Sequence, residues 1–454
     1  MIRAFLAALS VAVLAACAPV SPLDRTVPYK LAERPDYPGY GTGIATQDIQ
    51  WNAATLAADF GELIYVTEWG HEYERLLRWE KPVTIAIEDP VVRAQADILN
   101  DLMARVKAVA PNLRATVSNG PKGDITIRAA PKSEMRKQAP TALCFFVPVD
   151  ATWDQYVGGL HRTSGNWNSA ESLEAITIFV PANAPPHVYR ACIIEEVTQA
   201  LGPRNDIYGL EDSIYNDDNL HTWPTAFDLL MIAVLYDPDL KPFVKRPEAE
   251  RVAREAFASG RYGRIGTKSR KRHPKENRYL AYRDEFAAEK TTEKRYAVAQ
   301  KLIELAKTFD RADHRRAEAQ RRAGFVKYGA GDFTDAVVHF RQAVKDMRTA
   351  LGENTPRFAR VHSDLGLALM KLGNWQEADA AFGAAAPIMA AYGMDLELAH
   401  ILHLKSITEF ELGKTAEARA TALQSIDWAA YVFGADNKRV KNWRTALVDL
   451  GPLG

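Results

Sequence analysis

The chain has 454 residues, of which 47% are hydrophobic, so it is long enough to bury two or three separate cores. Its 57 Lys and Arg residues balance 57 Asp and Glu residues, so the net charge is zero and no overall field selects an acidic or a basic partner. Ten His and three Cys residues exclude a dense metal-ligand composition.

The first 17 residues have the pattern of a bacterial export signal. Arg3 forms a short basic region, and the apolar run that follows it is too short to span a bilayer as a helix. The run ends in Leu14-Ala15-Ala16-Cys17, which resembles the lipobox of bacterial lipoproteins. This resemblance implies that Cys17 is lipidated and anchors the chain in a membrane. Ala18 follows it and favours the outer membrane, with the protein facing the periplasm. The alternative is an ordinary secretory signal with a chance cysteine.

Residues 18–47 are predicted to form an extended tether between the membrane and the first domain. Repeated proline prevents both a helix and a central strand. Five prolines occur in this range among polar and glycine residues: Pro19, Pro22, Pro28, Pro35 and Pro38.

Residues 48–245 have the pattern of a mixed α/β or α+β domain. Apolar residues recur with helical spacing in 53–65 and 91–109. Helices that alternate with strands indicate a layer of helices against a sheet. Short β-branched runs bounded by turn residues predict strands at 82–87, 123–127 and 175–180.

Two further cysteines, Cys144 and Cys192, remain in the exported chain. An oxidising compartment favours a disulfide between them, although a free buried thiol is also common. Cys192 precedes Glu195 by three residues, so a bridge would brace the motif that begins there.

Residues 195–206 resemble the metzincin pattern H-E-x-x-H-x-x-G-x-x-H in every register position. Glu196 stands at the position of the general base, and Gly202 stands at the turn. The downstream segment 213–217 resembles a Met-turn in which Tyr215 replaces the methionine. The three histidine ligands of the pattern are replaced here by Glu195, Gln199 and Asn205.

These replacements change the chemistry that the motif supports. Zinc in such sites is held by imidazole nitrogen, whereas a carboxylate and two amide oxygens form a harder and weaker ligand set. Such a set suits Ca²⁺ or Mg²⁺ better than zinc, so no cofactor is predicted and an oxygen-ligated divalent cation is the alternative. Peptidase activity is therefore not expected. Glu196 would be catalytic only if the domain is a metal-dependent hydrolase acting on peptides or cell-wall material.

Several polar side chains are expected to line a binding cleft around this motif. A third interpretation is that Glu195, Gln199 and Asn205 form a buried polar network joining the helix to the following loop. His221 and Asp228 follow the motif and would approach the same cleft, and Trp167 and Trp223 flank it. The cleft residues are Glu195, Gln199, Asn205, Asp206, Tyr215 and Asn216.

The stretch from Cys144 to Leu240 is similar to a wider group of bacterial lipoproteins, domain of unknown function family 2927. The resemblance implies lipoprotein status and domain limits, and it carries no known activity. The matching pieces are Cys192, Glu195-Glu196-x-x-Gln199, Leu201-Gly202, Asn205-Asp206, Ser213-Ile214-Tyr215-Asn216-Asp217 and Leu235-Tyr236-Asp237-Pro238.

Residues 246–315 are rich in charge and are predicted to form a partly helical connector. The basic segment 261–278 has little apolar content, which is typical of a solvated stretch. Contact with anionic lipid head groups or with a cell-wall polymer is the alternative, and nucleic acid is not expected outside the cytoplasm.

Residues 316–454 contain a segment that occurs three times. The copies are 328–336, 370–378 and, more faintly, 410–418, with spacings of 42 and 40 residues. Each copy has a glycine where the first helix of a pair would end in a left-handed turn: Gly331, Gly373 and Gly413.

These copies resemble the longer variety of tetratricopeptide repeat, as in kinesin light chains. Small residues at Gly324 and Gly366 would let paired helices approach, and residues 436–450 would form a terminal capping helix. The second helix of each pair would pack through Ala336, Ala378 and Ala418, with Phe340 and Phe382 four residues later and Ala422 in the third copy.

Together these patterns predict a zincin-like α/β (α+β) domain followed by an all-α tetratricopeptide-repeat solenoid. The resemblance implies that the solenoid presents a concave surface to a protein or peptide partner. The chain is expected to act as an envelope scaffold held at the membrane through Cys17.

Overall fold

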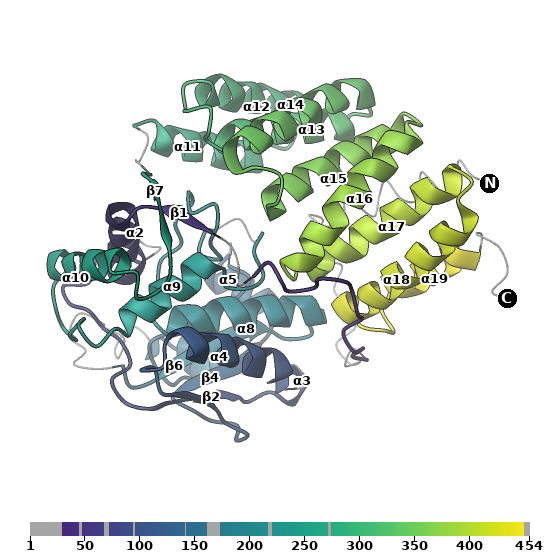
Figure 1. The fold of residues 1–454 in the computed structure, drawn as a ribbon. Coiled ribbons are helices and arrows are strands. Elements are labelled where there is room, and N and C mark those ends of the chain that lie inside the picture. The colour runs from purple at the N-terminus through teal and green to yellow at the C-terminus, as the bar shows by residue number, and fades with distance from the viewer. Residues whose placement is uncertain are drawn as a thin grey trace.

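The computed structural model describes residues 30–44, 48–67, 72–93, 96–140, 142–160, 173–216, 220–270 and 274–448. An α/β domain lies beside an arc of paired helices (Figure 1). The predicted signal segment 1–17 with Cys17 lies outside the described residues, as do Trp167 and Asp217. The predicted fold class is confirmed, because a mixed α/β region precedes a helical repeat array.

The α/β domain is built on a five-stranded sheet with strand order β3-β2-β4-β6-β5. Four neighbouring strands are parallel, and β5 pairs antiparallel to β6 at one edge. All six residues of β6 are buried, as expected for a strand covered on both faces. The strands are β2 (Val83–Ile87), β3 (Ala115–Val117), β4 (Ile125–Ala130), β5 (Phe145–Val147) and β6 (Ile176–Pro181).

Strands β2, β4 and β6 lie where β-branched runs occur in the sequence. The edge strands β3 and β5 have three residues each, which is too short to give a recognisable alternation. In the predicted helix at 91–109, the structure has the short α3 (Pro90–Arg93) and then α4 (Ala96–Val109).

The helices of this domain cover the sheet and enclose one large apolar core. Helix α8 packs on β4, β5 and β6 and also contacts α4. In the described parts of residues 53–235, the helices besides α3 and α4 are α2 (Ala53–Tyr65), α5 (Lys132–Gln138), α6 (Trp153–Val157), α8 (Pro186–Ala200) and α9 (Ala226–Leu235).

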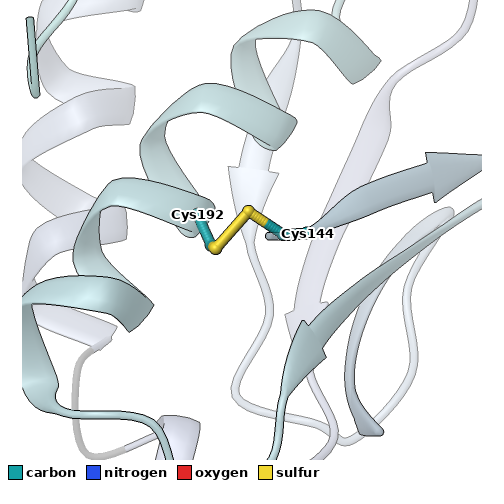
Figure 2. Close-up of a disulfide and its surroundings, with 2 residues drawn as sticks. All are labelled: Cys144 and Cys192. Atoms are coloured by element: carbon teal, nitrogen blue, oxygen red, sulfur yellow. A yellow bond between two sulfur atoms is a disulfide. The ribbon is translucent and has the colours of Figure 1, made fainter. Parts of the chain in front are cut away.

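A disulfide joins Cys144, immediately before β5, to Cys192 in the middle of α8 (Figure 2). Their Cα atoms are 5.9 Å apart, and 48 residues separate them in sequence. Because β5 is an edge strand, the bridge ties the edge of the sheet directly to the helix that carries the metzincin-like motif.

The charged range 246–315 is not a separate connector, which corrects the sequence prediction. Helix α10 (Arg246–Ala258) packs on α2, where a Cβ on Gly61 would lie 2.0 Å from Glu250 Oε1. Strand β7 (Ile265–Lys268) then pairs in parallel with β1 (Ile49–Trp51). The sequence pattern missed these contacts because the apolar partners lie about 200 residues earlier in the chain.

The rest of this range forms a helix pair that packs against the start of the repeat array. Helices α11 (Glu276–Ala288) and α12 (Thr292–Ala306) form a hairpin, and α12 packs on the next helix of the array. A separate apolar cluster around Tyr279, Leu302 and Phe309 holds this hairpin in place.

The repeat array consists of three helix pairs and a terminal helix. Glycines after the first helix of each pair have positive φ: +81° at Gly331, +74° at Gly373 and +77° at Gly413. The left-handed backbone at these three positions explains the recurring glycine. The elements are α13 (Arg315–Gly329), α14 (Phe333–Leu351), α15 (Pro356–Lys371), α16 (Trp375–Ala391), α17 (Asp395–Glu411), α18 (Thr415–Phe433) and α19 (Lys438–Val448).

Small residues set the spacing within each pair. A Cβ on Gly324 would lie 2.7 Å from the ring of Phe340, and a Cβ on Gly366 would lie 2.9 Å from the ring of Phe382. The predicted alanines at the start of each second helix are fully buried: Ala336, Ala378 and Ala418.

Residues 30–44 are not a free tether, which corrects the prediction for this part of 18–47. This segment, here called the N-terminal strap, runs along the array and reaches the α/β domain (Figure 1). Tyr40 stacks on Trp428 of α18, and Ile44 is buried in the core of the α/β domain. Proline excludes regular structure in the strap, but side chains and backbone N–H groups still bind it to both regions.

Candidate functional site

Helix α8 carries the metzincin-like motif and is buried along most of its length. Pro186 occupies its first turn, where the missing N–H costs nothing. At its other end, Trp79 Nε1 donates to Ala200 O at 2.9 Å, and Tyr236 Oη donates to Leu201 O at 2.7 Å. These donors satisfy carbonyls that a helix end leaves without partners, so the last turn of α8 is fixed by two aromatic side chains.

The polar residues of the motif lie against protein. Glu196 is 5% exposed and Gln199 is 2% exposed, whereas Glu195 is half-buried. Gln199 Nε2 donates to Asp206 Oδ1 at 3.0 Å. The side chain of Gln199 therefore joins α8 to the following loop.

The loop after α8 is attached to α2 in the same manner. Asn205 Nδ2 donates to Glu62 O at 3.3 Å, and Arg204 N donates to Leu63 O at 2.8 Å. The guanidinium of Arg204 is also buried and donates to Leu77 O at 2.8 Å. Gly202 opens this loop, and a Cβ there would lie 1.9 Å from Leu235 Cδ2. The turn glycine is required by close packing against α9.

The segment that resembles a Met-turn is buried beneath this loop. Tyr215 is fully buried, and burial raises its pKa well above the ordinary value. Its backbone carbonyl accepts from Ile207 N at 2.7 Å, and Asn216 Nδ2 donates to Leu210 O at 3.0 Å. Both residues hold the loop in shape.

Asp228 has a structural place at the start of α9. It forms a capping box with Thr225 and also accepts from Ile214 N at 3.1 Å and from Ser213 Oγ. Burial raises the pKa of its carboxyl to about 7 despite these donors. His221 lies apart from this group, with Nε2 3.4 Å from Glu211 O.

The structure thus brings two of the expected site residues, Gln199 and Asn205, into bonds that join α8 to its loop and the loop to α2. This arrangement agrees with the third interpretation of the motif, a buried polar network. Among the described residues, no three His, Cys, Asp or Glu side chains are grouped so as to hold a metal ion. Gln199 and Asn205 donate through their amide nitrogens, and the amide oxygens are harder ligands than the imidazoles of a three-ligand zinc site, so these residues do not fit zinc.

A cleft of about 470 Å³ lies elsewhere, between the N-terminal strap and α4. None of the six expected cleft residues lines it. Its walls include Arg34, Tyr40, Asp101, Arg105 and Trp223, with Arg105 Cζ 5.0 Å from the centroid of Trp223. Trp223 therefore faces this cleft and is 5% exposed.

A charge cluster that the sequence did not reveal lies at the junction of α2, the loop after α8 and the segment after β7. Arg270 Nη1 is 3.0 Å from Asp59 Oδ2, and its Nη2 is 3.7 Å from both Glu211 Oε2 and Asp212 Oδ1. Burial raises the pKa of Asp59 to about 6 and also raises the pKa values of Glu211 and Asp212. Only the fold brings these carboxyl groups together around one arginine.

A second such network lies within the array around Glu318. This carboxylate is buried, 2.8 Å from Arg360 Nη2, and further arginines lie within 4 Å. Their charges hold its pKa well below the ordinary range. One of them, Arg357, also donates to Glu211 O at 2.9 Å and so links the array to the α/β domain.

Comparison with known proteins agrees with this two-part organisation. The model of a family described as "Protein of unknown function (DUF2927)" matches residues 53–255. None of the curated proteins compared matches the chain.

Solved structures resemble the helical part. Nearly identical TPR-like repeats from a predicted kinesin light chain of Podosopora anserina share 15% identity, with a TM-score of 0.33, over 40% of this chain and 93% of that one. BtubC (BKLC) from P. vanneervenii shares 15% identity, with a TM-score of 0.30, over 50% of this chain and 83% of that one. A Rap protein complexed with Competence and Sporulation Factor shares 12% identity, with a TM-score of 0.29, over 49% of this chain and 59% of that one.

These TM-scores are low, so the description of the array rests on its own helix pairs and turn glycines. The chain therefore joins a region that matches the DUF2927 model to an array of helix pairs whose turn glycines recur as in tetratricopeptide repeats.

Proposed function

We propose that this protein is a scaffold whose repeat array binds a protein or peptide partner, and whose α/β domain is metallopeptidase-like without peptidase activity. The observation that carries the proposal is the array of three helix pairs in α13–α18. Stacked helix pairs of this kind form extended surfaces that suit a protein partner better than a small substrate.

The contacts of α8 support a non-catalytic α/β domain. A general base must reach the water or proton on which it acts, whereas Glu196 is 5% exposed on a helix packed against the sheet. Gln199 and Asn205 hold the following loop through Asp206 and Glu62 O. These side chains stabilise the fold in a way that requires no reaction.

Attachment to the cell envelope is part of the same proposal. It rests on the lipobox-like sequence that ends at Cys17 and places the protein on the outer membrane, facing the periplasm. Within the described ranges, no helix is both long enough and apolar enough to cross a membrane. Feeding cells a labelled fatty acid tests the anchor: the full-length chain should incorporate label, and the Cys17→Ala variant should not.

Metal binding separates the scaffold from a metal-dependent hydrolase. The chain beginning at residue 18 is incubated with zinc, calcium or magnesium and then examined by native mass spectrometry. A scaffold should retain none of them at stoichiometric level. One equivalent that disappears in the Glu195→Ala, Gln199→Ala double variant would contradict the proposal and justify a substrate screen.

Partner binding is tested with photo-crosslinking residues placed on exposed parts of the array. Leu372, directly after α15, is 40% exposed, and Phe410, on α17, is 36% exposed. Leu143, which is 43% exposed in the α/β domain, serves as the control. Crosslinks to the same protein from both array positions, and not from Leu143, are expected. Crosslinking that is equal at all three positions would contradict a binding role for the array, and Glu196→Gln should leave the pattern unchanged.

A further inference from the structure

One edge of the array is covered by the chain itself. This edge, here called the strap-binding edge, consists of the C-terminal ends of α16 and α18 and the N-terminal end of α17. The N-terminal strap, residues 30–44, lies along it from α18 to α16 (Figure 1).

Backbone hydrogen bonds fix both ends of the strap. At one end, Ala435 N donates to Lys30 O at 2.8 Å, and Lys30 N donates to Asp436 Oδ1 at 3.1 Å. At the other end, Gly41 N donates to Ala390 O at 2.9 Å, and Gly43 N donates to Ala391 O at 2.8 Å. The last carbonyls of a helix lack the usual partners within it, and the strap donates to two of them at the end of α16.

A tyrosine occupies the middle of the edge. The ring of Tyr40 stacks on Trp428 with centroids 5.2 Å apart, and its hydroxyl donates to Asp395 Oδ1. The Cζ atom of the Arg34 guanidinium lies 4.8 Å from the centroid of the Tyr40 ring. Tyr40 is therefore the side chain that anchors the strap, because it makes both an aromatic and a charge-assisted contact.

The α/β domain binds the same edge beside the strap. Arg190 Nη2, from α8, lies 3.7 Å from Asp395 Oδ2 and donates to Tyr431 O at 3.2 Å. Thr222 Oγ1 donates to Gly393 O at 3.0 Å. Asp395 therefore accepts a hydrogen bond from Tyr40 of the strap and forms an ion pair with Arg190 of α8. Through Asp395, the segment that occupies this edge is linked to the helix that carries the metzincin-like motif.

We propose that the strap-binding edge is a binding site for an extended tyrosine-containing peptide, and that residues 30–44 of this chain fill it as an intramolecular ligand. A partner segment with a tyrosine for Trp428 and Asp395, followed by small residues that let its N–H groups reach the end of α16, competes with the strap. The close fit at Gly43, where a Cβ would lie 3.1 Å from the ring of Tyr392, selects a small residue there. This inference rests on the proposed function of the array as a binding surface.

The test begins with the chain from residue 18, with a protease recognition sequence inserted between Ile44 and Asp48. The folded protein is cut, and gel filtration shows whether the strap fragment stays with the body. Retention of the wild-type fragment is expected, because its contacts survive the loss of the covalent link. In the same experiment, Tyr40→Ala should release the fragment, whereas Asp36→Ala, at an exposed position, should not.

Competition then measures the site directly. A labelled synthetic peptide of residues 30–44 is titrated into the body from which the fragment has been removed, and binding is followed by anisotropy. Replacement of Tyr40 by Ala in the peptide, or Asp395→Asn in the body, should weaken binding at least tenfold, and the uncut chain should bind no peptide. Loss of the wild-type fragment on cutting without rebinding of the peptide, or equal binding of the Tyr40→Ala peptide, would overturn the proposal.

This test needs no partner protein, so its result is separate from that of the proposed function. Peptide binding without crosslinked partners would leave a purely intramolecular clasp. Crosslinked partners without peptide binding would support the scaffold function and contradict the proposal that the strap competes with a partner.

Discussion

Both regions of the molecule contain tightly packed glycines, but the sequence separation between each glycine and the residue it packs against differs between the two regions. In the array, Gly324 meets Phe340 and Gly366 meets Phe382, so each partner stands sixteen residues later in the second helix of the same pair. A close approach that recurs at the same spacing is visible in the sequence as a repeat.

The glycines of the α/β domain pack against residues that no local sequence pattern predicts. Gly61 lies against Glu250, and Gly202 lies against Leu235. Both contacts depend on helices that return to the site after long excursions of the chain. The array is therefore specified by local, repeated contacts, whereas the α/β domain is specified by long-range contacts that occur once.

The largest expected effect concerns the disulfide of the α/β domain. Replacing both Cys144 and Cys192 with Ala should lower the free energy of unfolding by about 4 kcal/mol, because the 48-residue separation makes loop closure costly in the unfolded chain. Chemical denaturation of the oxidised protein and of the variant measures this change.

Hydrogen exchange locates the loss of stability caused by removing the disulfide. Faster exchange should be concentrated in β5 and α8, and α13–α16 should retain most of their protection. Equal loss of protection in both regions would mean that the array has no local stability of its own, which would contradict the distinction between local contacts in the array and long-range contacts in the α/β domain.

The next effect tests the charge network of the array. Glu318→Gln should destabilise the protein by about 3 kcal/mol, because it leaves buried arginines without their shared carboxylate. The matched control is Glu377→Gln at the exposed pair with Arg341, which should cost less than about 1 kcal/mol. Thermal unfolding of both variants provides the measurement, and similar losses would show that Glu318 is no more than a surface partner.

The repeat geometry is tested by two glycines of one helix. Gly324→Ala should lower the free energy of unfolding by about 2 kcal/mol, because the ring of buried Phe340 has no room to move. Gly329→Ala meets nothing within 4 Å and should be neutral or stabilise the helix by up to about 1 kcal/mol. Denaturant titrations of the two variants distinguish packing from helix propensity, and matching losses would count against the close helix approach.

The smallest effect concerns pH at the contact between the two regions. His187, on α8, lies with Nδ1 2.9 Å from Val432 O, and burial lowers its pKa to about 4. Below pH 6.5 the unfolded chain binds a proton here that the folded chain accepts only near pH 4, so the free energy of unfolding decreases as pH falls through this window. Between pH 7 and pH 5, the wild type should therefore lose about 1–2 kcal/mol more than His187→Gln.

The difference between the two proteins is the diagnostic quantity. Buried carboxyl groups with raised pKa values, Asp228 and Glu397 at about 7, favour the folded chain at lower pH and give the opposite slope. Denaturation curves at both pH values should diverge for wild type and variant. Parallel behaviour would mean that His187 is protonated in the folded state.

For the candidate site, the sequence located the right helix and loop but not what their side chains contact. The metzincin-like pattern placed Glu195 and Gln199 in one motif, and both residues lie on α8. Their burial, the bond from Gln199 to Asp206, and the attachment of Asn205 to Glu62 O come from the packing of α2 and the loop. The sequence of a motif is the same whether its polar side chains face solvent or another helix, so the motif does not reveal their burial.

By itself, the sequence determined the repeat array, the main strands and the position of the metzincin-like helix, because each depends on residues a few turns or a few dozen positions apart. Tertiary structure alone decided that the charged range 246–315 is divided between the two regions, and that the strap binds the array through Tyr40. It also gathered Asp59, Glu211 and Asp212 around Arg270. Contacts between groups about 60 to nearly 400 residues apart leave no periodicity in a single sequence, and their energies depend on burial that only the folded chain creates.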